Sequence, residues 1–170
     1  MSSLISDLLA WDGKSKPAIA QVFVRHVKEE DFLTDILSLL VEPKLQVGAS
    51  WLLKHGLDNR SFNLSQKQAT AVYRCVQRLE QWEAKLHVLQ CMPCLTISPS
   101  QVKRVKKFCD ECLEDKNKFV RAWAYSGLYE LAETHPRFQE EVGAKLLEGM
   151  ETETAGSIKV RIRRALEAGF

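Results

Sequence analysis

The stretch NKFVRAWAYSGLYELA, residues 117–132, decides the fold class of this chain. Val120, Ala124 and Leu128 recur at every fourth position, which places them on one face of an α-helix. Asn117 comes directly before the apolar residues begin, and Asn is favoured at helix N-termini. The stretch therefore predicts an amphipathic helix that buries one apolar face against its neighbours.

A similar segment returns later in the chain. Residues 157–166, SIKVRIRRAL, again place a Val-Arg pair just inside a predicted helix, and Val160 lies 40 residues after Val120. Predicted helices at residues 45–55 and 82–92 continue the series toward the N-terminus, at intervals of about 37 to 40 residues. This interval is close to the roughly 40 to 47 residues of HEAT and armadillo repeats. The sequence therefore predicts a helical repeat.

The rest of the chain is also predicted to be helical. Apolar residues recur at spacings of three and four, and no run has the alternation and flanking turns of a β-hairpin. Ser65 with Gln68 forms a capping-box pattern, and Ser98-Pro99 is typical of a helix start. Breaks are expected at residues 13–17, 42–43, 56–63, 93–99, 115–117, 135–136 and 152–156. The pattern predicts an all-α fold of eight to ten helices joined by short turns.

The composition excludes several classes of protein. Of the 170 residues, 45% are hydrophobic and 27% charged, which is typical of an ordered, soluble chain. The formal charge of +2 is too small for the long-range field of a dedicated nucleic-acid binder. The N-terminus has no signal-peptide pattern, and no apolar stretch approaches the length of a membrane span. Five cysteines without an export signal are expected to be reduced, so we expect a cytoplasmic location and no membrane partner.

A family resemblance supports the repeat. The Val120-Arg121 pair followed by Ala124, Leu128 and Leu131 resembles the second helix of a HEAT repeat. Residues 117–170 are similar to the C-terminal end of small bacterial HEAT-like proteins of unassigned function. The resemblance implies a right-handed α-α superhelix, a HEAT-like solenoid of about four stacked helix pairs, as a single domain over residues 1–170. Its repeats are clearest over residues 80–170 and degenerate over residues 1–79.

Four of the cysteines form two C-x-x-C pairs. Paired elements of this kind can give zinc four thiolates. However, the second pair continues the apolar stripe of a predicted helix, and that helix would carry it about 14 Å from the first pair. We therefore expect core cysteines, with no bound metal and no cofactor. The less favoured alternative is a zinc site at Cys91, Cys94, Cys109 and Cys112.

Motifs for catalysis are absent from the sequence. There is no Gly-rich phosphate loop, no His-Glu-x-x-His motif and no Gly-x-Ser-x-Gly elbow, so no catalytic residue is assigned. Glu83, His87 and Gln90 share a polar stripe of one predicted helix, but no Ser or Cys nucleophile can be matched to His87. Lys85 lies in the apolar arc of the same helix and is expected to reach along its neighbours to water. An enzyme is therefore less favoured than a binding protein.

We expect a non-enzymatic protein–protein interaction or scaffold module that binds an unknown protein partner on the surface of its second helices. Trp123 and Tyr125 are candidates for that surface, because they cannot both point to it and also into the core stripe formed by Val120, Ala124 and Leu128. Arg121 and Arg161 also have a structural explanation, since such arginines in HEAT repeats commonly join neighbouring repeats through acidic residues. The candidate partner-binding residues are Glu83, His87, Arg121, Trp123, Tyr125 and Arg163.

A nucleic-acid-binding protein is the alternative. The segment FVRAWAYSGLYELA at residues 119–132 and the following His135-Pro136 resemble a late helix of the HEAT-repeat alkylpurine DNA glycosylases. This resemblance implies a concave basic groove that holds a DNA duplex. Glu83 stands where that family has an Asp beside tryptophan, so no catalytic carboxylate is carried over. The candidate nucleic-acid-binding residues are Lys103, Arg104, Lys107, Lys159, Arg161 and Arg164.

Overall fold

A computed structural model describes residues 2–170 of the chain, which contain helices and no β-strand. The all-α prediction and the expected number of helices are confirmed. The ten α-helices are α1 (Ser2–Ala10), α2 (Lys16–His26), α3 (Phe32–Leu39), α4 (Gln46–Asp58), α5 (Gln66–Cys75), α6 (Trp82–Cys91), α7 (Val102–Leu113), α8 (Lys118–Thr134), α9 (Gln139–Thr152) and α10 (Gly156–Ala168). Short 3-10 helices follow α5, α6 and α8 at Val76–Arg78, Met92–Cys94 and Pro136–Phe138.

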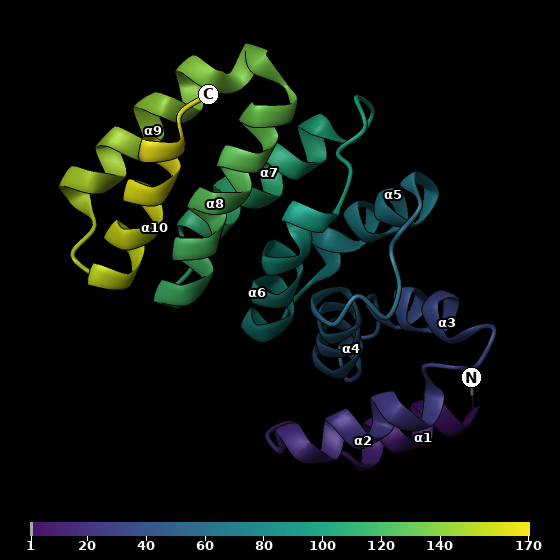
Figure 1. Cartoon of the computed structure of the whole chain (residues 1–170). Helices are drawn as coiled ribbons and strands as arrows, with labels where there is room; N and C mark the ends of the chain where they lie inside the picture. Colours follow the sequence, from purple (N-terminus) through teal and green to yellow (C-terminus); the bar gives the residue numbers. More distant parts are fainter. Residues whose placement is uncertain (1) are drawn as a thin grey trace.

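The even-numbered helices form a continuous row. Helices α2, α4, α6, α8 and α10 each contact the next one in this order, and α4 to α10 follow one another across the molecule in Figure 1. Among the odd-numbered helices, α3 contacts α5 and α5 contacts α7, and the two rows meet where α3 packs on α4 and α7 packs on α8. Successive even helices are therefore in contact, and α4 and α8 are each also packed against an odd helix.

Local sequence signals explain the starts of α5 and α8. At α5, Ser65 Oγ accepts a hydrogen bond from the backbone N–H of Gln68, and the Gln68 side chain accepts from the Ser65 N–H, so the capping box is confirmed. At α8, the Asn117 side chain accepts from the Phe119 N–H. The start predicted at Ser98-Pro99 is wrong, because residues 99–101 form a turn and α7 begins at Val102.

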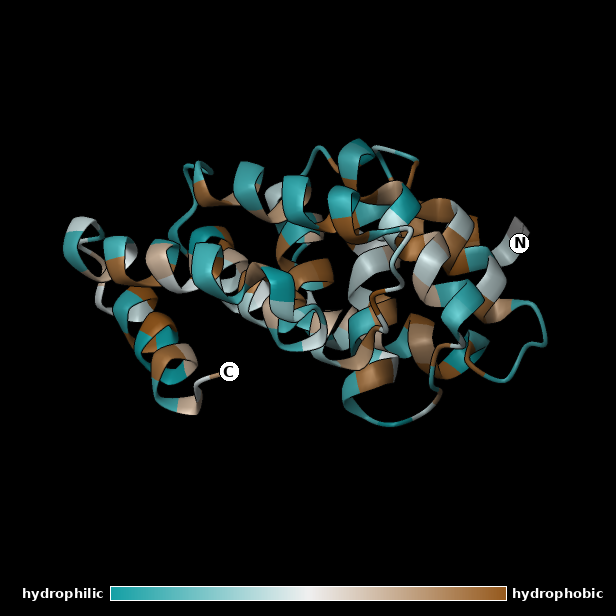
Figure 2. Cartoon of the chain, turned by 90° about the horizontal axis from the view of Figure 1, so that it is seen from above, coloured by the Kyte–Doolittle hydropathy of each residue, from teal (hydrophilic) through white to brown (hydrophobic). Residues whose placement is uncertain are grey.

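One apolar core runs through both rows of helices. Large side chains that are fully buried extend from Leu4 and Ile19 near the N-terminus to Leu128 and Leu131 in α8. Hydrophobic residues lie mainly on the helix faces turned toward other helices, and hydrophilic residues cover the outer turns (Figure 2). No helix within residues 2–170 combines the length and the apolar content needed to span a membrane.

The burial pattern corrects the predicted repeat interval. Val120 is fully buried in α8, whereas Val160 in α10 is 42% exposed. Ile158 and Ile162 are the fully buried residues of α10, with the same spacing as Val120 and Ala124. The position equivalent to Val120 is therefore Ile158, and the interval is 38 residues rather than 40. The Val-Arg pair is misleading because a residue type alone does not reveal which face of a helix is buried.

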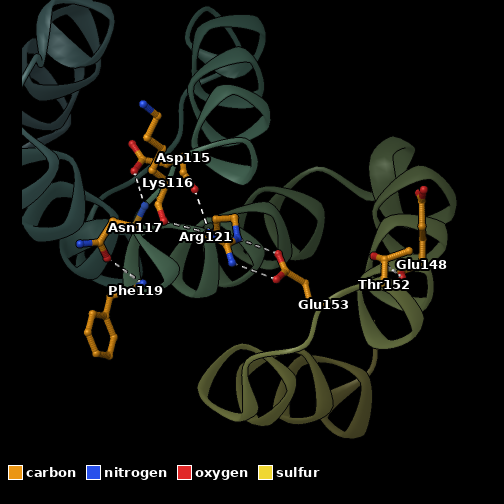
Figure 3. Close-up of polar contacts among 8 residues, drawn as sticks. All are labelled: Asp115, Lys116, Asn117, Phe119, Arg121, Glu148, Thr152 and Glu153. Carbon is orange, nitrogen blue, oxygen red and sulfur yellow. Dashed lines mark hydrogen bonds and ion pairs between the residues drawn. The ribbon is translucent and has the colours of Figure 1, made fainter.

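Polar links join successive even helices along one edge of the molecule. Arg121 in α8 donates through Nε to Glu153 Oε1 at 2.9 Å and through a terminal nitrogen to Glu153 Oε2 at 3.2 Å. Its other terminal nitrogen donates to the Asp115 carbonyl at 3.0 Å, so this guanidinium joins the segments before α8 and before α10 (Figure 3). Hydrogen bonding to Glu153 raises the pKa of Arg121. The expected structural role of Arg121 is therefore confirmed.

Two further polar links also join one even helix to the segment before the next even helix. Lys85 in α6, which stands 36 residues before Arg121, lies 3.2 Å from a carboxylate oxygen of Asp115 in the segment before α8. Gln46 at the start of α4 is fully buried, and its Oε1 accepts from the backbone N–H groups of Glu80 at 2.6 Å and Gln81 at 2.9 Å, just before α6. In each link, a side chain of one even helix fixes the start of the next.

Candidate functional site

The six candidate partner-binding residues lie in different places. Arg121 and Tyr125 line a hollow of about 560 Å³ between α7, α8 and α9. Tyr125 is 7% exposed, its ring lies against Gly149, and burial, with nearby Glu153, raises its pKa. These two residues therefore contribute to contacts between helices.

Trp123 lies on a different side of α8 from Tyr125. The guanidinium carbon of Arg161 lies 3.4 Å from the centre of a Trp123 ring, which is a cation–π contact between α8 and α10. Arg161 forms no ion pair within residues 2–170, so the predicted acidic partner for this arginine is wrong. Arg163, on the same helix, is exposed.

Glu83 and His87 lie together in a groove at the N-terminal half of the even row. The groove consists of two adjoining hollows of about 350 and 300 Å³, which share Trp11, Gly13, Val47 and Glu83. The first hollow is completed by Lys14, Lys16, Trp51, Lys54, Leu86, His87 and Gln90. The second is completed by Leu8, Pro43, Lys44, Leu45, Gly48 and Gln81. Helices α4 and α6 and the loops before α2 and α4 therefore build one elongated depression.

A tight loop holds one wall of the groove. Trp11 donates through Nε1 to the Ser15 carbonyl at 2.9 Å. Asp12 Oδ1 accepts from the backbone N–H groups of Lys14 at 2.9 Å and Ser15 at 2.8 Å, and these hydrogen bonds lower the Asp12 pKa. Gly13 has a φ of 74°, a conformation that favours glycine. The loop thus places the Trp11 ring and the Lys14 side chain at the groove.

A chain of rings supports the part of the groove that α4 contributes. Trp51 stacks on His55 in the next turn of α4, with ring centres 4.5 Å apart and planes inclined by 15°. His55 in turn meets the Phe23 ring of α2 edge-on at 4.8 Å. Partial burial lowers the pKa of His55, which favours the neutral ring in this stack. The groove is therefore lined by two tryptophans, Trp11 and Trp51, and each is fixed by its own partner.

His87 has a hydroxyl partner that the sequence does not reveal. Its Nδ1 lies 2.9 Å from Ser50 Oγ, which also donates to the Val47 carbonyl at 3.1 Å. Burial lowers the pKa of His87 to about 4, so the ring is neutral near pH 7. Because Ser50 is fully buried and does not line the groove, it cannot reach a substrate. The hydrogen bond between Ser50 and His87 therefore fixes the orientation of the His87 ring, and the Ser50 hydroxyl is not placed to act as a nucleophile in the groove.

The groove has an excess of positive charge. Four lysines line it, namely Lys14, Lys16, Lys44 and Lys54, against the single carboxylate of Glu83. Lys54 is paired with Asp58, which stands four residues later in α4. Among the described residues, no carboxylate forms an ion pair with Lys14, Lys16 or Lys44, and no cation forms one with Glu83. Three ammonium groups and one carboxylate are thus available to a ligand.

The candidate nucleic-acid-binding residues occupy two separate helices. Lys103, Arg104 and Lys107 lie on α7 in the odd row, whereas Lys159, Arg161 and Arg164 lie on α10 in the even row. Arg104 donates to Gln101 Oε1 at 2.8 Å, and Lys107 lies 3.6 Å from Glu111. The structure therefore does not bring the two basic clusters onto one row of helices.

The cysteines do not assemble a zinc site. Cys91, Cys109 and Cys112 are buried in the core, whereas Cys94 is exposed. Cys109 Sγ packs with Met92 Sδ around Gly127, and burial raises the pKa of Cys112 to about 12. Within residues 2–170, no group of three or more His, Cys, Asp or Glu side chains is arranged to hold a metal ion. The structure therefore does not bring the four thiols together, because the helical register directs those of Cys91, Cys109 and Cys112 into the core.

Comparisons with known proteins add no assignment to this site. No protein-family model matches the chain, and no significant match is found among curated proteins or solved structures.

A regular spacing of aromatic and histidine rings in the sequence points to the site. Trp51, His87 and Trp123 stand 36 residues apart on α4, α6 and α8, so ring-bearing side chains recur at one position of successive even helices.

Proposed function

We propose that this protein is a non-enzymatic interaction module that binds a protein partner on the side of its even-numbered helices that bears the groove, which we call the open side. The groove between α4, α6 and the loop at residues 11–15 carries this proposal. It combines two fixed tryptophan rings with unpaired charges, and buried aromatic anchors beside polar groups are typical of the centres of protein interfaces. Glu83, His87, Trp123 and Arg163 belong to the proposed surface, whereas Arg121 and Tyr125 are left out because they join helices.

The proposed architecture is a right-handed HEAT-like superhelix with the even helices as its inner row. The ordered contacts from α2 to α10 support it, as do the repeated links from Gln46, Lys85 and Arg121. Ten α-helices would form five successive pairs, one more than the sequence predicts. In such an array each pair contacts mainly its neighbours, and one long surface remains for a ligand.

Site-specific photo-crosslinking tests the proposed function. A photoreactive amino acid placed at Gln90 or Ser126 lies on the even row, whereas one at Lys103 lies on the odd row and is the matched control. We expect discrete protein adducts from Gln90 and Ser126 in cells that express the protein, and none from Lys103. Adducts from Lys103 alone, or from none of the three positions, contradict the proposal.

Nucleic-acid binding is the second candidate, and one observation favours it. Lys159, Arg161 and Arg164 lie on one even helix, and Arg161 is stacked on Trp123, an arrangement that can support phosphate contacts beside an aromatic surface. A salt-dependent titration with a short DNA duplex tests it. Binding that falls steeply between low and moderate salt, and that is lost in Arg164→Glu, would support this candidate. Absence of binding at low salt would exclude it.

A further inference from the structure

We propose that the groove binds an acidic peptide segment of the partner, in which an aromatic or aliphatic side chain stands among Asp or Glu residues. This inference rests on the proposed function and specifies the chemistry of the ligand. Three features carry it: the elongated shape of the groove, the unpaired lysines along it, and the carboxylate of Glu83, which lines both hollows.

The shape fits an extended chain. The two hollows, of about 350 and 300 Å³, adjoin through Trp11, Gly13, Val47 and Glu83. Each is near the lower limit for a small-molecule pocket, but together they form a longer depression. Val47 and the two tryptophans provide apolar surface for one side chain of a peptide. The adjoining hollow between Leu8 and Pro43 can receive a second side chain.

The charges select an acidic ligand. Lys14 and Lys16 belong to the first hollow and Lys44 to the second, and all three are exposed and form no ion pair with a described carboxylate. Carboxylates of a bound peptide can therefore pair with lysines in both hollows. Such pairs mainly set specificity and the association rate, and salt weakens them.

Glu83 distinguishes a peptide from a polynucleotide. Glu83 lines both hollows, so it borders the hollow that Lys14 and Lys16 line and the hollow that Lys44 lines. A phosphate backbone that followed the groove would meet this negative charge and has no N–H group to offer it. A peptide backbone carries an N–H group at nearly every residue, and a carboxylate accepts such hydrogen bonds well. The groove chemistry thus favours a peptide.

The experiment begins with a random peptide library displayed on phage and panned against the full-length protein. The consensus peptide is then synthesised with a fluorescent label and titrated by anisotropy at low and moderate salt. Three variants are compared with the unmodified protein: the double variant Lys14→Glu/Lys16→Glu, Glu83→Gln, and the control Lys103→Glu on α7. Circular dichroism of each variant checks that it is folded, and these sites are exposed or half-buried and make no interhelical ion pair.

We expect the lysine double variant to weaken peptide binding and Glu83→Gln to strengthen it. An acidic consensus with an apolar residue should be enriched, and the double variant should bind it at least about tenfold more weakly at low salt. Glu83→Gln keeps a side-chain oxygen that accepts a peptide N–H and removes a negative charge that repels the acidic ligand, so it should bind the peptide about two- to fivefold more tightly. Lys103→Glu should change the affinity by less than about twofold. A purely structural role of these residues would not produce a gain in affinity at Glu83.

Several outcomes would overturn the inference. These are the absence of any enriched peptide, a consensus without acidic residues, or equal losses in the double variant and the Lys103→Glu control. Displacement of the labelled peptide by a short DNA duplex, with loss of duplex binding in the double variant, would reassign the groove to nucleic acid. If the inference fails while Gln90 and Ser126 still give protein adducts, the proposed function stands and its contact surface lies elsewhere on the even row.

Discussion

Replacement of Arg121 by Ala should cost this protein a large part of its stability. The guanidinium forms a two-pronged pair with Glu153 and also donates to the Asp115 carbonyl, so one side chain fixes the starts of both α8 and α10. The pair is sheltered, because the Arg121 and Glu153 side chains are 23% and 13% exposed. Removal of Arg121 would leave a half-buried carboxylate and a carbonyl without their donors.

The magnitude follows from the number and burial of these bonds. Breaking a well-buried pair costs about 3 to 5 kcal/mol, and exposed pairs contribute less than about 1 kcal/mol. Because the pair is partly exposed, we expect Arg121→Ala to lower the free energy of unfolding by about 3 kcal/mol, which lowers the melting temperature of a chain of this size by about 6 to 12 °C. Arg121→Lys keeps the charge but loses the planar fork, so we expect a loss of about 1 to 2 kcal/mol.

Urea unfolding, followed by circular dichroism, measures these free energies. A double-mutant cycle with Glu153→Gln should give a coupling energy of about 1 to 2 kcal/mol. Lys107→Ala serves as the control because Lys107 and Glu111 form an exposed pair at 3.6 Å, and its loss should cost less than about 0.5 kcal/mol. Hydrogen exchange should show that α10 loses protection first. A coupling energy near zero would refute this account of the links.

Three further predictions concern the core, one titratable side chain and the thiols. Gly149→Ala should lose about 1 to 3 kcal/mol of stability in thermal unfolding, because its Cβ would lie 2.6 Å from the Tyr125 hydroxyl, while Gly143→Ala on the same helix has open space and should gain about 0.5 to 1 kcal/mol. Burial lowers the pKa of His87 from 6.5 to about 4, so the unfolded chain takes up a proton first on acidification. The stability present above pH 6.5 should therefore fall by up to about 3 kcal/mol as the pH drops to 4, and urea titrations of His87→Gln should lack this component. Cys94 is exposed and Cys75 half-buried, so mass spectrometry should find Cys94 labelled fastest in the native protein and that fast phase lost in Cys94→Ser, and rapid labelling of Cys91, Cys109 or Cys112 would contradict the buried core.

The fold class could be predicted from the sequence because local signals mark most helix ends. Asn117 and the Ser65 capping box act within one turn of backbone, and Gly or Pro accompanies most of the predicted breaks. The turn at residues 27–31 contains neither Gly nor Pro and was not predicted. It depends on distant contacts, since the buried His26 ring lies 2.7 Å from Asp7 in α1 and 2.8 Å from Glu29 in the turn itself.

Only part of the candidate site could be predicted. The spacing of Glu83 and His87 places both on one face of a helix, which needs no knowledge of the rest of the chain. Their surroundings depend on tertiary packing: Ser50 stands 37 residues before His87, and Trp11 reaches the groove from a different loop. The position of Arg121 and Tyr125 between helices could not be predicted for the same reason, because a helical period defines relative faces without identifying the neighbour on each face.

In α6 and α8, the residues that link neighbouring helices and the residues that carry the recurring rings occupy different positions. Lys85 and Arg121 bind the segment before the next even helix, and His87 and Trp123 stand two residues later. Residues two apart on a helix point in different directions, so the contact that joins the array and the side chain that meets the open side do not compete. Exposed charges of the groove can therefore be reversed while the links stay in place. For this reason, a change in ligand binding without a change in stability is an informative result in this fold.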